Sequence, residues 1–489
     1  MRSLFDLITI VRPTSSQLSG KMLALVEGVL SGKFKKKEDV IEGLFANNSD
    51  PEQSYRKLAQ RTERHLTYLL MISHSDAGGT QQAYHECWAN MTQAMLLFGR
   101  GIKKSGVEVA RKVISKAEKY EYIYILAPLL NILERHYAYV EPNRRLYKHY
   151  AKAAKKNGLL IEIDTLSNRY YSNAMMELSM RSSYTTGIIN KLERYTRELS
   201  QYVQPTVQVK YQYTVLEAVR CFALQDYSRA ALICTETLKA FDHMTAANGY
   251  LKAQLLHIRS VAAIAAGQYD SADSSLRKAK QLAGKNINSW HILAYYRAIC
   301  ALHSKDYEKA YLLYKEAQER KPQRILAEMW AILHAYLYLF NAAEQLYTFG
   351  DRFRLGKFFN QTVEASQDKA GLNVNIIVAD MLISLHQNRD RFLHRIEPVR
   401  NYVYRHLKGK ATERVRLFLE LLFLIPKFDF NPHRLEQAST SLCRKLKRRS
   451  VYANHNLEIE IVPFENLWEI TLELLGYGKM ERRKISGGI

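Results

Sequence analysis

The 489-residue sequence has few residues that interrupt helices and no pattern of paired cysteines. It contains 10 prolines and 22 glycines. Long helices tolerate few of either residue, so this scarcity favours helices over a β-sandwich or a β-barrel. The five cysteines lie far apart, are odd in number and include no CxxC spacing, which argues against a disulfide framework and a thiolate zinc site. We therefore expect an all-α protein in a reducing compartment.

Long apolar runs are also missing. No stretch reaches the ~20 apolar residues that a membrane span needs, and the longest run, Met329–Phe340, is interrupted by His334. The first 20 residues lack the apolar segment and small-residue cleavage site of a secretory signal. These absences predict a cytoplasmic protein without a membrane span.

The motifs of common enzyme and metal sites are absent from the sequence. Gly20-Lys21 and Gly32-Lys33 lack the spacing of a phosphate-binding loop, and no GxGxxG, HExxH or GxSxG occurs. His85-Glu86-Cys87 contains metal-ligand residue types, but adjacent residues on a helix point in different directions. The sequence therefore predicts no enzyme, no cofactor and no metal site.

Acidic residues are scarce relative to basic ones. The chain has 71 Lys and Arg against 48 Asp and Glu, a net charge of +23. A strongly basic surface attracts polyanions such as RNA, DNA or acidic lipid faces. A generally basic proteome or a need for solubility is the simpler alternative.

What the sequence does contain is an internal repeat. Three segments place an alanine three residues after a tyrosine: Asp226–Ala230, Gln268–Ala272 and Asp306–Ala310. Two helices approach closely only where a small side chain separates their backbones, and each alanine meets that need. Each such hairpin buries only part of its apolar surface alone, so it stacks on the next.

The residues that come after each alanine repeat as well. The positions four and seven residues further on are Cys234 and Thr237, Leu276 and Ala279, and Tyr314 and Ala317. Pro322 comes after the third copy. This pattern resembles the tetratricopeptide repeat (TPR) family, whose second helix carries small and large residues at these offsets. The resemblance implies an α-α superhelix, a solenoid of antiparallel helical hairpins.

Helical periodicity continues on both sides of residues 204–322, where the resemblance is clearest. We expect TPR-like repeats over residues 79–350, an N-terminal helical segment over 1–78 and a C-terminal helical cap with a basic tail over 351–489. Leu457–Ile461 alternates with period two, as either a short strand or an extended connector does.

The resemblance also implies a peptide groove, because relatives bind peptides along the concave face formed by the first helix of each hairpin. Ten residues occupy that face by resemblance: Gln212, Val215, Val219, Phe222, Gln254, His257, Val261, Ile292, Tyr295 and Ile299. Some relatives clamp a peptide carboxylate with a Lys and an Asn, and the matching positions here carry neither. Such an apolar, aromatic groove suits an amphipathic helix or an apolar peptide. The same residues equally suit packing against the next turn or the C-terminal tail.

Basic residues gather in several runs. Nine are candidates for polyanion binding: Arg56, Lys57, Arg61, Arg64, Arg444, Lys445, Lys447, Arg448 and Arg449. A further series recurs near helical spacing, with Tyr147 and Tyr150 close by: Arg144, Arg145, Lys148, Lys152, Lys155 and Lys156. Cations that meet phosphates release counterions, and tyrosines can stack on bases. A solvated helix face is the simpler explanation of any single run.

The N-terminal segment has the layout of a helix-turn-helix. Glu38–Phe45 predicts a short helix, Asn47–Pro51 a turn in which Ser49 or Asp50 can cap the next helix, and Gln53–Leu70 a longer basic helix. The segment resembles the winged-helix front end of bacterial transcriptional activators that continue into helical repeats. It departs from them at Met71–Thr80, which is too short and too polar for a wing. The alternative is a capping hairpin.

These patterns support two hypotheses. The first is a non-catalytic scaffold or adaptor that binds a protein or peptide partner through a TPR-like superhelix. The second is a nucleic-acid-binding or transcription-regulatory protein that uses the basic patches and the helix-turn-helix-like segment.

Overall fold

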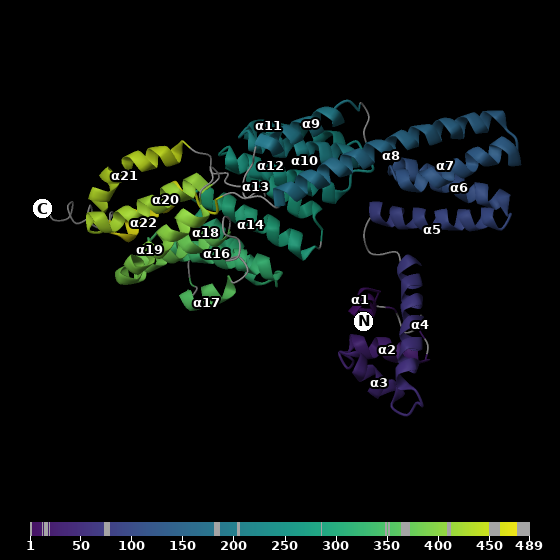
Figure 1. The fold of residues 1–489 in the computed structure, drawn as a ribbon, viewed down its shortest axis with the longest axis horizontal. Helices are drawn as coiled ribbons and strands as arrows, with labels where there is room; N and C mark the ends of the chain where they lie inside the picture. The colour runs from purple at the N-terminus through teal and green to yellow at the C-terminus, as the bar shows by residue number, and fades with distance from the viewer. Residues whose placement is uncertain are drawn as a thin grey trace. The chain divides into compact units, whose positions relative to one another are not determined.

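The computed structural model describes the chain except for residues 1, 12, 14–17, 19, 73–78, 180–185, 203–205, 285, 348–349, 351–352, 363–371, 408–411, 449–459 and 477–489. The described residues form 22 α-helices and no strand, so the predicted all-α class is confirmed. Contacts divide the chain into two compact units, Met1–Ile161 and Glu162–Ile489, and Figure 1 shows their helices in chain order. Most of the expected alternating segment at Leu457–Ile461 lies outside the described residues.

The first unit begins with four helices that share one small core. They are α1 (Arg2–Val11), α2 (Gly20–Leu30), α3 (Lys37–Phe45) and α4 (Pro51–Ile72). Phe34 lies between α2 and α3, and a Cβ atom added at Gly28 or Gly43 would stand 2.2 or 2.8 Å from its ring. Glycine at these two positions therefore lets the helices close around the phenylalanine.

The rest of the first unit has a separate core. Its helices are α5 (Thr80–Gly99), α6 (Lys103–Lys119), α7 (Ile123–Arg135), the π-helical turn His136–Val140 and the first half of α8 (Arg144–Ser179). Packing is tightest between α5 and α6 and continues from α6 to α7. These helices confirm the helical periodicity that the sequence shows before residue 204.

The second unit continues as helices in which each packs mainly on its neighbour in the sequence. The helices that carry the three sequence repeats are α10 (Val207–Ala223), α11 (Tyr227–Phe241), α12 (Gly249–Ala265), α13 (Tyr269–Leu282), α14 (Ile287–His303) and α15 (Tyr307–Gln318). They are preceded by α9 (Thr186–Leu199). They are followed by α16 (Arg324–Ala342), α17 (Leu355–Gln361), α18 (Leu372–Gln387), α19 (Arg389–His406), α20 (Glu413–Leu424), α21 (Pro432–Lys447) and α22 (Phe464–Leu474).

The same backbone turn closes the three hairpins that carry the sequence motif. In each turn one residue takes a left-handed conformation. These residues are Gln225, Gly267 and Lys305, with φ of 60°, 73° and 61° respectively. The next amide then donates to a carbonyl five residues back, as from Gln268 to Ala263 at 2.8 Å. This bond pattern is a Schellman C-cap, which satisfies the carbonyls at a helix end and reverses the chain. Gly101 after α5 and Glu344 after α16 have the same geometry, although the sequence motif is absent there.

The alanines of the motif belong to the hydrophobic core of the second unit. Ala230, Ala272 and Ala310 are each 0% exposed. The tyrosines beside them join neighbouring helices: Tyr307 stacks on Phe340 of α16 at 4.1 Å between ring centroids, and Tyr269 meets the ring of His303 at 6.2 Å. The burial of the alanines agrees with the close helix packing that the sequence predicts for them.

A buried ionic cluster holds α22 against the end of the hairpins. The Arg414 guanidinium of α20 donates to both carboxylate oxygens of Glu460, at 2.5 and 2.9 Å, and to Glu465 at 2.6 Å. It also donates to the backbone oxygen of Leu446 at the end of α21. The ring Nε2 of His303 in α14 lies 2.6 Å from the carbonyl oxygen of Glu460. One arginine therefore ties α20, α21 and the start of α22 together.

One described helix, α16, is long and apolar enough to cross a membrane by length and composition. About half of its apolar window, 56%, is buried inside the structure, and Trp330, Leu333 and Leu337 are almost fully covered. A core helix passes the same test, so the described residues include no clear membrane span.

Replacing Ala272 or Ala310 with leucine should lower the melting temperature. Each alanine is fully covered, and overpacking of this kind costs about 1–3 kcal/mol. Leu312→Ala on the outer face of α15 is the matched control, because Leu312 is 66% exposed. Thermal unfolding followed by circular dichroism measures the effect. Unchanged melting of both leucine variants would contradict the assigned hairpin contacts.

Stability should also fall as the pH drops below about 6.5. Burial lowers the pKa of His303 to about 4. Between about pH 6.5 and pH 4 this imidazole is therefore protonated in the unfolded chain and neutral in the folded chain. The stabilisation is complete above the unfolded pKa and is lost as the pH falls towards 4, amounting to roughly 2 kcal/mol by pH 5. Urea unfolding of the protein and of His303→Gln at pH 8 and pH 5 tests this. The glutamine variant should lose less stability over that interval; an equal loss would rule out the histidine as a cause.

Candidate nucleic-acid interface

The helix-turn-helix-like segment is formed by α3, a short turn and α4. The Asp50 carboxylate accepts a hydrogen bond from the Gln53 amide at 2.9 Å, and Pro51 occupies the first position of α4, where its missing N–H costs nothing. Of the two predicted caps, Asp50 makes this bond. At the start of α3, the amides of Lys35 and Lys36 donate to Asp39 and lower the pKa of its carboxyl. Figure 1 shows α2 and α3 beside the first turns of α4.

One face of α4 is buried and the opposite face is basic. Tyr55, Thr62, Leu66 and Leu69 recur at helical spacing and are at most 6% exposed. The four predicted polyanion candidates Arg56, Lys57, Arg61 and Arg64 are all exposed. At about 100° of rotation per residue they fall within an arc of roughly 140° that is centred opposite the buried face. The fold therefore brings these four candidates together on one surface, which we call the α4 basic face.

The α4 basic face is not neutralised by carboxylates. Within the described part of the chain, none of its four cations makes an ion pair or a hydrogen bond. Of the two acidic residues on α4, Glu52 is held by Lys37 from α3 at 2.5 Å, and Glu63 lies outside the arc of the cations. Four charges that are free to move to a ligand are suited to phosphate contacts.

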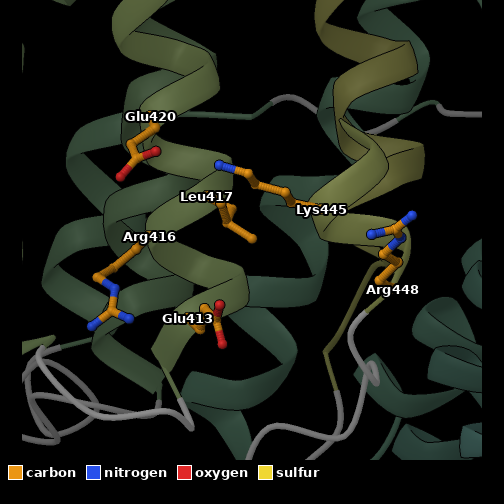
Figure 2. A pocket seen from close by; sticks show the side chains of 6 residues that line it. All are labelled: Glu413, Arg416, Leu417, Glu420, Lys445 and Arg448. Carbon is orange, nitrogen blue, oxygen red and sulfur yellow. The ribbon is translucent and has the colours of Figure 1, made fainter. Parts of the chain in front are cut away.

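The second group of candidates lies at the end of α21 and borders a cleft. The cleft has a volume of ≈ 580 Å³ and is lined by Glu413, Arg416, Leu417, Glu420, Lys445 and Arg448. Figure 2 shows Lys445 reaching toward α20, whereas Arg416 and Arg448 point away from each other. Arg444 and Lys447 are exposed at the same helix end, and Arg449 lies outside the described residues.

This cleft is less suited to a polyanion than the α4 basic face. Its two carboxylates offset two of its three cations, and Arg416 already donates to the Leu407 carbonyl at 2.7 Å. Arg444, Lys445 and Lys447 occupy the last turn of α21, where cations interact favourably with unpaired carbonyls at the helix terminus. A stabilising role at the helix end accounts for these residues without a ligand.

The predicted groove residues lie mainly inside the second unit. Seven of the ten are at most 5% exposed: Gln212, Val215, Val219, Phe222, Val261, Tyr295 and Ile299. The other three, Gln254, His257 and Ile292, are half-buried. The Gln212 side chain bonds to Ser167 and Asn168 of α8, both at 2.6 Å. Of the two roles that the sequence left open for these residues, the structure shows core packing for the buried seven.

Aromatic rings from the following helices pack against the predicted groove residues. His257 of α12 packs edge-on against Tyr296 of α14 at 4.5 Å. Tyr295 packs in the same way against Trp330 of α16 at 5.3 Å, and the Trp330 indole donates to His291 at 3.2 Å. Each hairpin therefore covers the inner side chains of the one before it. Burial lowers the pKa of His257 to about 4, so this imidazole is neutral.

Helix α5 carries one exposed apolar surface that was not predicted from the sequence. Tyr84, Trp88 and Met95 recur at helical spacing on α5 and are 41%, 40% and 40% exposed. We call these residues the α5 apolar stripe. The signal was present in the sequence, because the 20 residues of α5 contain no Asp, Lys or Arg and a single Glu, Glu86, which pairs with Lys116.

No cluster of three or more His, Cys, Asp and Glu side chains able to hold a metal occurs in the described part of the chain. A scan against protein-family models and a search of curated proteins each found no match to this chain. Any functional proposal for the chain therefore depends on the residues themselves.

Proposed function

We propose that the chain is a non-catalytic protein that binds nucleic acid through the α4 basic face. The observation that carries the proposal is the set of four exposed cations opposite the core of α4, without carboxylate partners among the described residues. Lys and Arg that meet phosphates release condensed counterions, which is the main source of sequence-independent affinity. The protein's net charge of +23 would strengthen the attraction at long range.

The arrangement of α3 and α4 suits duplex DNA. A helix of 22 residues is about 33 Å long, and the major groove of B-DNA admits one helix. In a helix-turn-helix the second helix enters that groove while the first supports it. We assign those roles to α4 and α3. The hairpins α10–α15 then serve as a TPR-like superhelical frame in a cytoplasmic protein, a location in keeping with its free cysteines.

Neutralising three cations of the α4 basic face should weaken duplex binding and flatten its salt dependence. For Lys57→Gln, Arg61→Gln and Arg64→Gln together, the slope of log K against log salt should change by about 3, because each phosphate contact contributes about 0.9. Fluorescence anisotropy with a labelled 20-base-pair duplex at 50–200 mM salt measures both quantities.

The matched control is the triple variant Arg444→Gln, Lys445→Gln and Lys447→Gln, which removes the same charge from the end of α21. It should bind nearly as the unchanged protein does. If the two triple variants lose the same affinity, or if the α4 variant loses none, the assignment to α4 is contradicted.

A protein-binding scaffold is the second candidate, and the α5 apolar stripe favours it. Its residues span about three turns of helix and lack charge, so the surface fits an apolar, helical segment of a partner protein and not a polyanion. Trp88 is the single exposed tryptophan of the four, since Trp290, Trp330 and Trp468 are at most 8% exposed. Its fluorescence therefore reports on this surface.

A neutral amphipathic peptide of leucine and glutamine should shift the Trp88 emission to shorter wavelength and protect it from acrylamide. Burial of an indole against leucines removes it from water, which produces both effects. A peptide of the same composition with its apolar face scrambled is the control, as is the protein variant Tyr84→Ser with Met95→Ser. Equal responses to both peptides, or no response, would contradict the scaffold candidate.

A further inference from the structure

The first half of α8 carries six cations on its surface. Arg144, Arg145, Lys148, Lys152, Lys155 and Lys156 are all exposed. No acidic residue occurs between Glu141 and Glu162. Like the α4 basic face, these six cations make no ion pair or hydrogen bond within the described part of the chain. We call them the α8 basic stripe.

The stripe is regular. Arg144, Lys148, Lys152 and Lys156 succeed one another at intervals of four residues, which is about 6 Å along the helix axis. At about 100° of rotation per residue, all six cations lie within an arc of roughly 120°. The whole stripe is about 18 Å long. It is therefore one continuous surface and not a scatter of charges.

Packing holds the stripe toward solvent. Tyr150 and Asn157 lie on the opposite side of α8 and are buried. Tyr150 stacks on Tyr137 at 5.7 Å between ring centroids, and the Asn157 amide donates to the Ile123 carbonyl at 2.9 Å. Because these contacts fix the rotation of α8 against the π-helical turn and α7, the cations cannot turn inward.

The stripe is costly for the helix that carries it. Like charges four residues apart destabilise a helix, and the stripe contains three such pairs in succession. Carboxylates at some of these positions would remove that cost. A bound polyanion would remove it as well, because its phosphates screen the repulsion.

An exposed aromatic ring adjoins the stripe. Tyr147 is 39% exposed and lies one turn after Arg144 on the same helix. Bases of a single strand are free to stack on such a ring, whereas the bases of a duplex are already stacked on one another. Cations that line a backbone beside an aromatic surface are typical of sites for single-stranded nucleic acid.

We propose that the α8 basic stripe is a second nucleic-acid site, which binds a single strand. The phosphates of the strand lie along Arg144–Lys156, and one of its bases stacks on Tyr147. Each of the six cations can contact one phosphate of the strand. This site is separate from the duplex site proposed on α4, and neither depends on the other.

The test uses the full chain and a labelled 12-nucleotide strand of uridine or thymidine. The unchanged protein should bind with a slope of log K against log salt of about −4, because six contacts each contribute about 0.7. The variant Lys148→Gln, Lys152→Gln and Lys156→Gln should reduce that slope by about 2 and the affinity by at least roughly tenfold. Comparing the uridine and thymidine strands shows whether RNA or DNA is preferred.

Three controls make the result specific. The α21 triple variant carries the same charge change and should retain single-strand binding. The α4 triple variant should lose duplex binding and keep the single strand, and the α8 variant should show the reverse. Tyr147→Ser should weaken binding, and Tyr147→Phe should not. Circular dichroism confirms that each variant is folded.

Several outcomes would overturn the proposal. Unchanged single-strand binding by the α8 variant is one, and equal losses in the α8 and α21 variants are another, because they would indicate general charge attraction. A third is that the α8 variant loses binding to vesicles containing 30% phosphatidylserine but keeps the oligonucleotide. That result would assign the stripe to an acidic membrane surface.

Discussion

The close contact between paired helices is the constraint on which the second unit depends. Ala230, Ala272 and Ala310 let the two helices of each hairpin approach, and a left-handed residue at each turn reverses the chain so that they can meet. Once the spacing is fixed, Tyr307 and Tyr269 contact rings of the helix that follows, Phe340 of α16 and His303 of α14. The last hairpins are then closed by α22, held through Arg414 and Glu460. A larger side chain at any of these alanines would disturb several helices at once.

This packing decides which surfaces remain for binding. Neighbouring helices bury most of the predicted groove residues on α10, α12 and α14, so these side chains contribute mainly to stability. The exposed faces of α4 and α8 instead carry cations without carboxylate partners in the described residues. In both helices the buried side chains fix the rotation, which holds the charges outward. A fixed helix orientation means that the backbone of these helices need not be ordered when a polyanion binds.

The helices and their contact points could be predicted from the sequence, because small residues and helical periodicity report directly on packing. Asp50 as a cap and the alanines as contact points are examples. The burial of Val215, Val219 and Tyr295 could not be predicted, because apolar residues at helical spacing are equally compatible with a groove and with a core. The turns at Gly101 and Glu344 were not predicted because the tyrosine–alanine motif is absent there, and at Glu344 the left-handed residue is not a glycine. The α5 apolar stripe was marked only by missing charge.

Lysine footprinting of the unchanged protein tests whether cations on α4 and α8 contact nucleic acid. The protein is acetylated with and without excess duplex and single-stranded oligonucleotide at 50 mM salt, and each lysine is quantified by mass spectrometry. Duplex should protect Lys57, the single strand should protect Lys148, Lys152 and Lys156, and Lys445 should react equally in all samples. Uniform protection of all exposed lysines, or no protection on α4 and α8, would rule out both proposed sites.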